Sequence, residues 1–260
     1  MRVLVACEES QAVCKAFRER GHEAYSCDLQ ECSGGHPEWH IRGDALAALN
    51  PKDINATLPL DDIPQIVYGI EFTTMDGKHH YFNGKWDLII AHPPCTYLSN
   101  AGACRLFPKK GQLNQERYQK GLDAKAFFME FYNADCDKIC IENPIPTRVY
   151  GLPPYSQIVQ PYEYGHHYSK KTCLWLKGLP NLQPTDIVTE NIISWVSGGS
   201  KDNKGNPRKN KGTVYRDAKT RSKTFTGIAN AMADQWGNLK EEIQRGFIEE
   251  VEQISIFDVV

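Results

Sequence analysis

The order of apolar and polar positions at the start of the chain is typical of a β-α-β unit. An apolar run over residues 3–7 predicts a buried strand, and residues 10–20 place Val13, Ala16 and Phe17 on one face of a helix. Gly21 stands where a helix C-cap is expected, and residues 23–27 predict a second strand. Such a unit predicts a parallel sheet covered by helices.

A less regular segment over residues 51–85 interrupts this pattern. It alternates apolar and polar positions and carries the turn signals Asp76-Gly77 and Asn83-Gly84, so we predict an insertion that contains a small hairpin. The pattern then resumes. Strands are predicted over residues 86–91, 138–141 and 172–176, and helices over 115–133 and 224–252, the last of them broken at Gly237. The expected fold is Rossmann-like α/β, with a mostly parallel sheet and helices on both faces.

The predicted elements divide the chain into a core and two smaller parts. Residues 1–177 and 222–252 are expected to form the core, 178–221 a small separate region, and 253–260 a C-terminal tail. Between Lys201 and Lys223 basic residues dominate over acidic ones, in a stretch with many Gly and Asn residues. This segment is predicted to be a loop, which either binds a polyanion or is a solvated loop without a ligand.

Composition narrows the class of protein without indicating an activity. The chain has 260 residues and a formal net charge of -2, so its overall charge does not indicate nucleic-acid binding. No apolar run is long enough to span a membrane. The N-terminus enters a strand pattern directly, without a charged leader and cleavage site, which predicts a cytoplasmic protein.

The sequence contains nine cysteines, an odd number. In a reducing compartment they are expected as buried hydrophobes, metal ligands or reactive thiols. The spacing of Cys27, Cys32, His36 and His40 would allow a zinc site, but this cluster lacks a Cys-x-x-Cys knuckle. We therefore expect no metal.

Polar residues follow the predicted strands at the edge where an open α/β sheet binds its ligands. Asp28 ends the second strand, where an acidic side chain commonly binds ribose hydroxyls, or it is a turn residue. Asp44 follows Gly43 and is either a second cofactor contact or a helix N-cap. Two further strand ends carry Cys95 and Glu142.

A cysteine and a glutamate at neighbouring strand ends suggest chemistry on a pyrimidine. A thiolate attacks C6, which makes C5 nucleophilic, and a carboxyl group at the N3 edge stabilises the adduct. Cysteine suits this role because its thiolate is strongly nucleophilic and can leave again by elimination. The alternatives are a buried apolar thiol at Cys95 and a structural ion pair at Glu142.

Three motifs carry a resemblance to a known family. The segments are Pro93-Pro94-Cys95-Thr96-Tyr97-Leu98-Ser99, Ile141-Glu142-Asn143-Pro144 and Thr226-Gly227-Ile228-Ala229-Asn230-Ala231-Met232-Ala233. In order and approximate spacing they resemble the Pro-Cys, Glu-Asn-Val and late Gly-Asn motifs of the cytosine C5-specific DNA methyltransferases, in particular the short phage and prophage-type members. The resemblance implies a class I methyltransferase fold and S-adenosyl-L-methionine as cofactor.

The resemblance also implies roles for individual residues. Cys95 would be the nucleophile and Glu142 its acidic partner, and Lys170 or Lys171 would replace an arginine that the family places near the base. Implied cofactor contacts are Ala6, Cys7, Glu8, Ser10, Asp28, Asp44, His92, Pro93, Asn230 and Ala231, and implied substrate contacts are Pro94, Ser99, Asn143, Arg208, Lys209 and Lys211. The chain departs from the family in its first loop, where Cys7, Glu9 and Ser10 stand at positions expected to be glycine.

The expected partner is double-stranded DNA, in which the target cytosine would be flipped out of the stack, and residues 178–221 are expected to form a small basic target-recognition region. A second partner is suggested by Gln253, Ile254, Ser255, Ile256 and Phe257, which resemble the peptide that docks bacterial replication proteins on the β sliding clamp. A terminal strand that packs on its own domain is the alternative for this peptide.

Three alternatives to cytosine C5 transfer in DNA remain. An exocyclic amino methyltransferase would place an aromatic residue directly after Pro-Pro, whereas Cys95 occupies that position here. The substrate could also be RNA or a free nucleotide. The altered first loop would suit a catalytically silent protein that binds nucleic acid or the clamp.

Overall fold

The computed structural model describes residues 1–57, 64–109, 111–195, 220 and 222–239. A sheet of seven strands forms its centre, in the order β3-β2-β1-β7-β8-β11-β9. The first five run parallel, and β11 is antiparallel to both of its neighbours, β8 and β9. The strands are β1 (Arg2–Ala6), β2 (Glu23–Asp28), β3 (His40–Arg42), β7 (Leu88–Ala91), β8 (Ile139–Pro144), β9 (Gln157–Val159) and β11 (Thr172–Lys177). The predicted α/β class with a mostly parallel sheet is confirmed.

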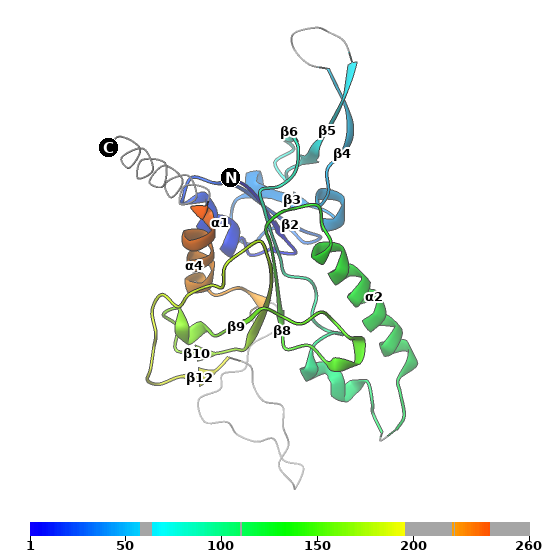
Figure 1. The fold of residues 1–260 in the computed structure, drawn as a ribbon, viewed down its shortest axis with the longest axis vertical. Helices are drawn as coiled ribbons and strands as arrows, with labels where there is room; N and C mark the ends of the chain where they lie inside the picture. The colour runs from blue at the N-terminus through cyan, green and yellow to red at the C-terminus, as the bar shows by residue number, and fades with distance from the viewer. Residues whose placement is uncertain (58–63, 110, 196–219, 221, 240–260) are drawn as a thin grey trace, which may run out of the picture.

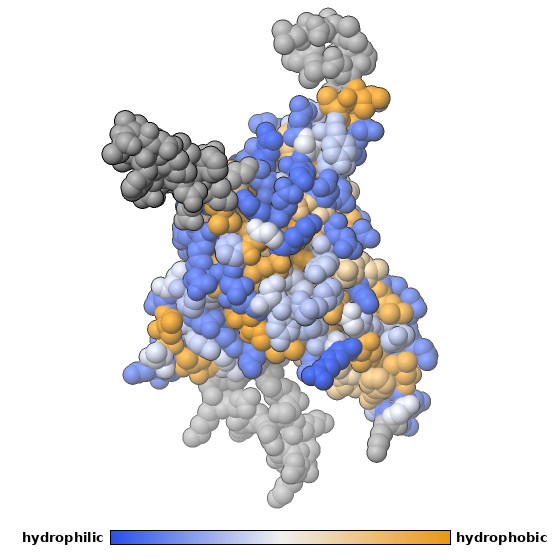
Figure 2. Space-filling view, in the orientation of Figure 1, coloured by the Kyte–Doolittle hydropathy of each residue, from blue (hydrophilic) through white to orange (hydrophobic). Residues whose placement is uncertain are grey.

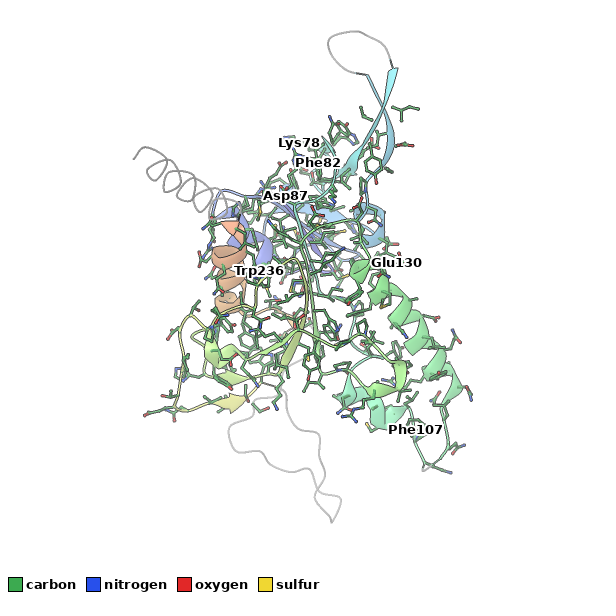
Figure 3. All side chains as sticks on the ribbon, in the orientation of Figure 1. Lys78, Phe82, Asp87, Phe107, Glu130 and Trp236 are labelled. Atoms are coloured by element: carbon green, nitrogen blue, oxygen red, sulfur yellow. The ribbon has the colours of Figure 1, made fainter. Side chains whose placement is uncertain are left out.

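Helices cover both faces of this sheet. Helices α1 (Ala12–Arg18) and α4 (Thr226–Gly237) lie side by side on one face, and α2 (Gln115–Tyr132) lies on the other (Figure 1). Figure 3 shows this separation through Trp236 on α4 and Glu130 on α2. Alternate residues of the central strands supply the two cores. Both faces are buried, which explains why these strands read as continuous apolar runs in the sequence.

Short polar and glycine signals set the helix ends. Both carboxylate oxygens of Glu8 accept hydrogen bonds from the start of α1, from the backbone N–H of Val13 at 2.7 Å and of Cys14 at 3.2 Å. Gly21 has the positive φ of 78° expected after the helix. Asn114 caps α2 by accepting from the Arg117 N–H at 3.0 Å. Short 3-10 turns connect the larger elements: η1 (Pro37–Trp39), η2 (Ala45–Ala48), η3 (Asn100–Arg105), η4 (Arg148–Tyr150) and η5 (Pro161–Glu163).

The insertion forms a three-stranded antiparallel sheet, one strand more than the predicted hairpin. Its strands are β4 (Lys52–Thr57), β5 (Pro64–Thr73) and β6 (His79–Asn83). It projects from the body as an arm with an apolar patch near its outer end (Figures 1 and 2). Lys85 pairs with Asp135 and Asp137, which precede β8, so the arm is anchored at the amino edge of the sheet.

The segment after β11 packs against the core as far as the structure describes it. Strands β10 (Tyr168–Ser169) and β12 (Ile193–Ser194) pair in parallel, and Leu182 is fully buried. Gln157 holds the Leu182 backbone through both its side-chain oxygen and its nitrogen. The predicted boundary at residue 177 stays a prediction. The basic stretch with Arg208, Lys209 and Lys211, the helix predicted beyond residue 239 and the clamp-like peptide 253–257 lie outside the described residues.

Candidate functional site

The strand order creates a switch point between β1 and β7. From β1 the chain proceeds outward through β2 to β3, and it then returns to build the sheet on the other side, beginning with β7. Ligands of open α/β sheets bind beyond the carboxyl ends of the strands at such a point. The His92 N–H donates to the Ala6 carbonyl oxygen at 2.9 Å, which joins the two strand ends.

The loop after β7 holds Cys95 in a defined turn. The N–H groups of Leu98 and Ser99 donate to the Cys95 carbonyl oxygen at 3.2 and 2.9 Å. Ser99 is buried and forms a β-bridge with Pro146, in the loop that follows β8. Cys95 is half-buried, whereas Cys140 and Cys173 on the neighbouring strands are fully buried. The loop therefore leaves this thiol partly accessible at the carboxyl edge of the sheet.

The end of β8 is tied directly to the Cys95 loop. Asn143, which is 2% exposed, donates from Nδ2 to the Pro93 carbonyl oxygen at 2.9 Å. Asn143, predicted as a substrate contact, therefore uses its amide group to fix the loop. The predicted nucleophile Cys95 and the predicted acid Glu142 accordingly lie on two backbone segments that are bonded to each other.

Glu142 forms a buried pair with His92. The distance from Nδ1 of His92 to Oε2 of Glu142 is 2.8 Å, and the side chains are 11% and 10% exposed. Burial favours the neutral imidazole, but the hydrogen bond and charge of Glu142 outweigh it and raise the pKa of His92 above its ordinary value. Burial likewise favours a neutral carboxyl, yet the His92 hydrogen bond and the Lys170 charge lower the pKa of Glu142. Of the two predicted lysines, Lys170 is close enough for its charge to lower the pKa of Glu142, while Lys171 is exposed.

The first loop adopts a backbone conformation that glycine favours, although it contains no glycine. Cys7 has φ 59° and Gln11 has φ 57°. Gln11 is fully buried, and its side chain binds the backbone N–H and carbonyl of His36. Glu8 was predicted to contact the cofactor. In the structure both of its carboxylate oxygens instead cap the start of α1. Ser10 is half-buried in the same loop.

Three predicted cofactor contacts lie close together at the ends of β1, β2 and β3. The pKa of Cys7 is raised by burial and further by the charges of Asp28 and Asp44. Burial and the same two carboxylates raise the pKa of Cys27 to about 12. One oxygen of Asp28 accepts from the Gln30 N–H at 2.9 Å, and one of Asp44 accepts from the Leu46 N–H at 3.0 Å, as an N-cap. Two carboxylates therefore lie at this edge of the sheet, and each also accepts a local backbone hydrogen bond.

The late motif is located away from this cluster. Asn230 is exposed on α4 and accepts a 3.4 Å hydrogen bond from Arg20, just beyond the C-terminal end of α1. Ala231 is 1% exposed and belongs to the core between α4 and the sheet. Ala6 and Pro93 are buried within the strand ends, and Pro94 is exposed beside Cys95.

Sequence reasoning missed a polar hollow next to the Cys95 loop. It has a volume of about 280 Å³ and is lined by Tyr97, Arg105, Asn114, Glu116, Arg117 and Lys120. The guanidinium of Arg117 lies 4.9 Å from the Tyr97 ring centroid and donates to the Thr96 carbonyl oxygen at 2.8 Å. The sequence signal was the arginine in the first turn of the helix over 115–133, whose position next to Tyr97 depends on tertiary packing.

Comparison with known proteins does not assign this site to a family. The chain matches no protein-family model, and no curated protein sequence matches it. Among the described residues, no group of three or more His, Cys, Asp or Glu side chains is arranged to hold a metal ion. Across the same part of the chain, no helix combines the length and apolar character needed to cross a membrane.

Proposed function

We propose that the chain is an S-adenosyl-L-methionine-dependent methyltransferase that modifies C5 of cytosine in DNA through a covalent adduct with Cys95. The observation that carries this proposal is the hydrogen bond from Asn143 to Pro93, because it holds the Cys95 loop against the strand end that bears Glu142. A half-buried thiol and a buried carboxyl group are thereby presented together at one edge of the sheet.

The strand order supports the fold that the proposal requires. Its first five strands follow the order 3-2-1-4-5 of the dinucleotide-binding α/β fold when numbered by appearance in the sheet. Cys95 follows the fourth of these strands, Glu142 lies near the end of the fifth, and Asp28 ends the second. The proposed cofactor and base sites would therefore be adjacent at a single carboxyl edge.

The chemistry assigns distinct tasks to the two side chains. The thiolate of Cys95 forms a bond to C6 of the base, and the electron pair of the C5–C6 double bond moves through C4 to N3. Glu142 delivers a proton to N3, so the adduct carries no net charge on the ring. C5 is then the nucleophilic carbon of an enamine. After transfer, the C5 proton is lost to solvent, the Cys95 thiolate leaves and N3 returns its proton to Glu142, which restores the aromatic ring.

The residues at the switch point fit the proposed cofactor. Asp28 and Asp44 provide acidic groups near Cys7, at the place where ribose hydroxyls bind in this class of sheet. Nε2 of His92 is buried without a hydrogen-bond partner among the described residues, as expected for an atom that faces a polar ligand. When bound, S-adenosyl-L-methionine supplies an electrophilic methyl group.

The proposed substrate is a nucleic acid because the hollow beside Cys95 combines cations with an aromatic ring. Arg105, Arg117 and Lys120 line it, and Tyr97 is two residues from Cys95. Arginine and lysine bind phosphates, and aromatic rings stack on unpaired bases. The basic stretch that contains Arg208, Lys209 and Lys211 extends this proposal.

Docking on a sliding clamp through residues 253–257 is a separate proposal, which a pull-down with that tail deleted would test.

A mechanism-based trap tests the proposed function. Duplex DNA with 5-fluorocytosine is incubated with the full chain and S-adenosyl-L-methionine, and covalent complexes are detected by denaturing electrophoresis. Fluorine at C5 blocks the final elimination, so a stable complex is expected from the wild-type chain and none from Cys95→Ala. The exposed cysteine in the same segment provides the control Cys104→Ala, which should form the complex normally. Turnover by Cys95→Ala would contradict the proposal.

A further inference from the structure

Resting on the proposed function, we propose that His92 stores the proton that Glu142 delivers to N3 of the base. His92 is then a positioning residue that acts through Glu142 with its Nδ1, in addition to the cofactor contact that its Nε2 would make. The pair would hold one proton between Nδ1 of His92 and Oε2 of Glu142, which are 2.8 Å apart.

The need for such a store follows from the surroundings of Glu142. A carboxylate that faces N3 cannot stabilise the adduct unless it carries or receives a proton, because N3 of cytosine has a lone pair. Yet Glu142 is held in its ionised form by His92 and Lys170. A proton must therefore reach the carboxylate from a group within hydrogen-bond distance. Among the described residues, His92 is at that distance from the carboxylate, at 2.8 Å.

The charges around His92 keep this proton in place. His92 contacts Glu142 from β8, and the carboxylate of Glu8, in the loop after β1, acts on it from the other strand end. Both carboxylates raise the pKa of His92, whereas burial and the Lys170 cation lower it, and the net direction is upward. The protonated imidazole is thus favoured over a wider pH range than in a free histidine.

The proton transfer balances without a further reactant. As the Cys95 thiolate bonds to C6, the electron pair displaced from the ring makes N3 basic. The Nδ1 proton of His92 passes to Oε2 of Glu142, and a proton leaves the same carboxyl group for N3, so Glu142 ends as a carboxylate again. His92 becomes neutral, and the ring gains one proton for the one thiolate that has added. The reverse transfer accompanies elimination of Cys95.

Two measurements on the full chain test this role. The first is nuclear magnetic resonance of ¹⁵N-labelled imidazoles, with the His92 signals assigned through His92→Gln. We expect both nitrogens of His92 to be protonated at pH 6.5, and the titration to move to lower pH in Glu142→Gln. A neutral His92 at pH 6.5, or a titration that Glu142→Gln leaves unchanged, would overturn the inference even if the enzyme is active.

The second measurement is the pH profile of adduct formation on 5-fluorocytosine DNA. Loss of a general acid commonly slows a reaction about 100-fold or more, so His92→Gln should be slowed by about that factor at pH 7.5. The deficit should shrink as the pH falls and Glu142 takes its proton from solvent. The control is His79→Gln, which removes an exposed histidine that pairs with Glu71 at 3.1 Å on the arm.

The outcomes separate this inference from the proposed function. Adduct formation by the wild-type chain with an unchanged pH profile in His92→Gln would overturn the inference alone. Failure of the wild-type chain to form any Cys95 adduct would overturn the proposed function and the role of His92 in it. A protonated His92 in the resonance spectrum would then identify the pair as a structural one.

Discussion

Asn143 and Pro93 are joined by a hydrogen bond of 2.9 Å that spans 50 positions of the chain and is fully buried on the Asn143 side. Through this bond the end of β8 positions the loop that carries Cys95. Together with the bridge between Ser99 and Pro146, it joins two separate strand ends into one candidate site.

Removal of this bond should affect both stability and adduct formation. In Asn143→Ala the Pro93 carbonyl loses its partner inside the protein, so the free energy of unfolding should fall by about 1–3 kcal/mol. The Cys95 adduct should also form more slowly, since one of the bonds that fix the loop is lost. Denaturant unfolding and the 5-fluorocytosine trap measure the two effects. Asn100→Ala changes an exposed residue of the same region and should cost less than about 0.5 kcal/mol; equal costs for the two variants would contradict the assignment.

The His92–Glu142 pair should make stability depend on pH in a bell shape. The pKa of His92 is raised, so its contribution is fully present below the ordinary value of 6.5 and is lost as the pH rises through the folded-state pKa. The pKa of Glu142 is lowered, so its contribution is present above the ordinary value of 4.5 and is lost as the pH falls through the folded-state pKa. The pair therefore contributes most between pH 4.5 and 6.5.

Unfolding of wild type and His92→Gln across the pH range checks this expectation. The difference in unfolding free energy should be about 1–3 kcal/mol near pH 5.5 and should decrease on both sides. A difference that stays constant between pH 4 and pH 9 would mean that the pKa values of the two groups do not change on folding, and would contradict this expectation.

Gly227 should be intolerant of any side chain. A Cβ atom at this position would lie 1.9 Å from the Tyr164 carbonyl oxygen, and the Gly227 N–H also donates to Nε2 of His166 at 3.0 Å. Gly227→Ala should therefore force α4 outward and cost about 1–3 kcal/mol of unfolding free energy. Gly43→Ala is the matched control, because a Cβ there meets no atom within 4 Å. Thermal unfolding of both variants distinguishes close packing from a general sensitivity to alanine.

Arg105 should contribute to nucleic-acid binding through the hollow beside Tyr97. Arg105→Glu is expected to weaken binding to DNA of any sequence and to lower the salt dependence by about one counterion, as loss of a phosphate contact does. Lys78→Glu makes the same charge change in the insertion. Figure 3 places Lys78 far from Phe107, which follows Arg105 closely in the chain. Fluorescence anisotropy at several salt concentrations compares the two, and equal losses would exclude a specific contribution of the hollow.

The central strands of the sheet and the polar residues at their ends follow from the local sequence. A parallel strand that is buried on both faces gives a continuous apolar run, which made these strands recognisable in the sequence. The polar residues that follow such runs could be chosen as candidates because ligands bind at the carboxyl ends of the strands. Cys95, Glu142 and Asp28 were selected on that basis. Gly21 could also be predicted as the residue after α1, because the positive φ at that position is a local property of the backbone that glycine favours.

The tertiary structure decided which of these residues meet. Asn143 and His92 were read as contacts to substrate and cofactor, but their bonds to Pro93 and Glu142 depend on β7 and β8 being neighbours in the sheet. The third strand of the insertion depends likewise on its pairing with β5, and the amino edge where the insertion meets the body is marked by the contacts of Lys85 with Asp135 and Asp137. Hydrogen bonds and charge pairs between residues distant in sequence leave no periodic signal, because they form only once the sheet has brought the strand ends together.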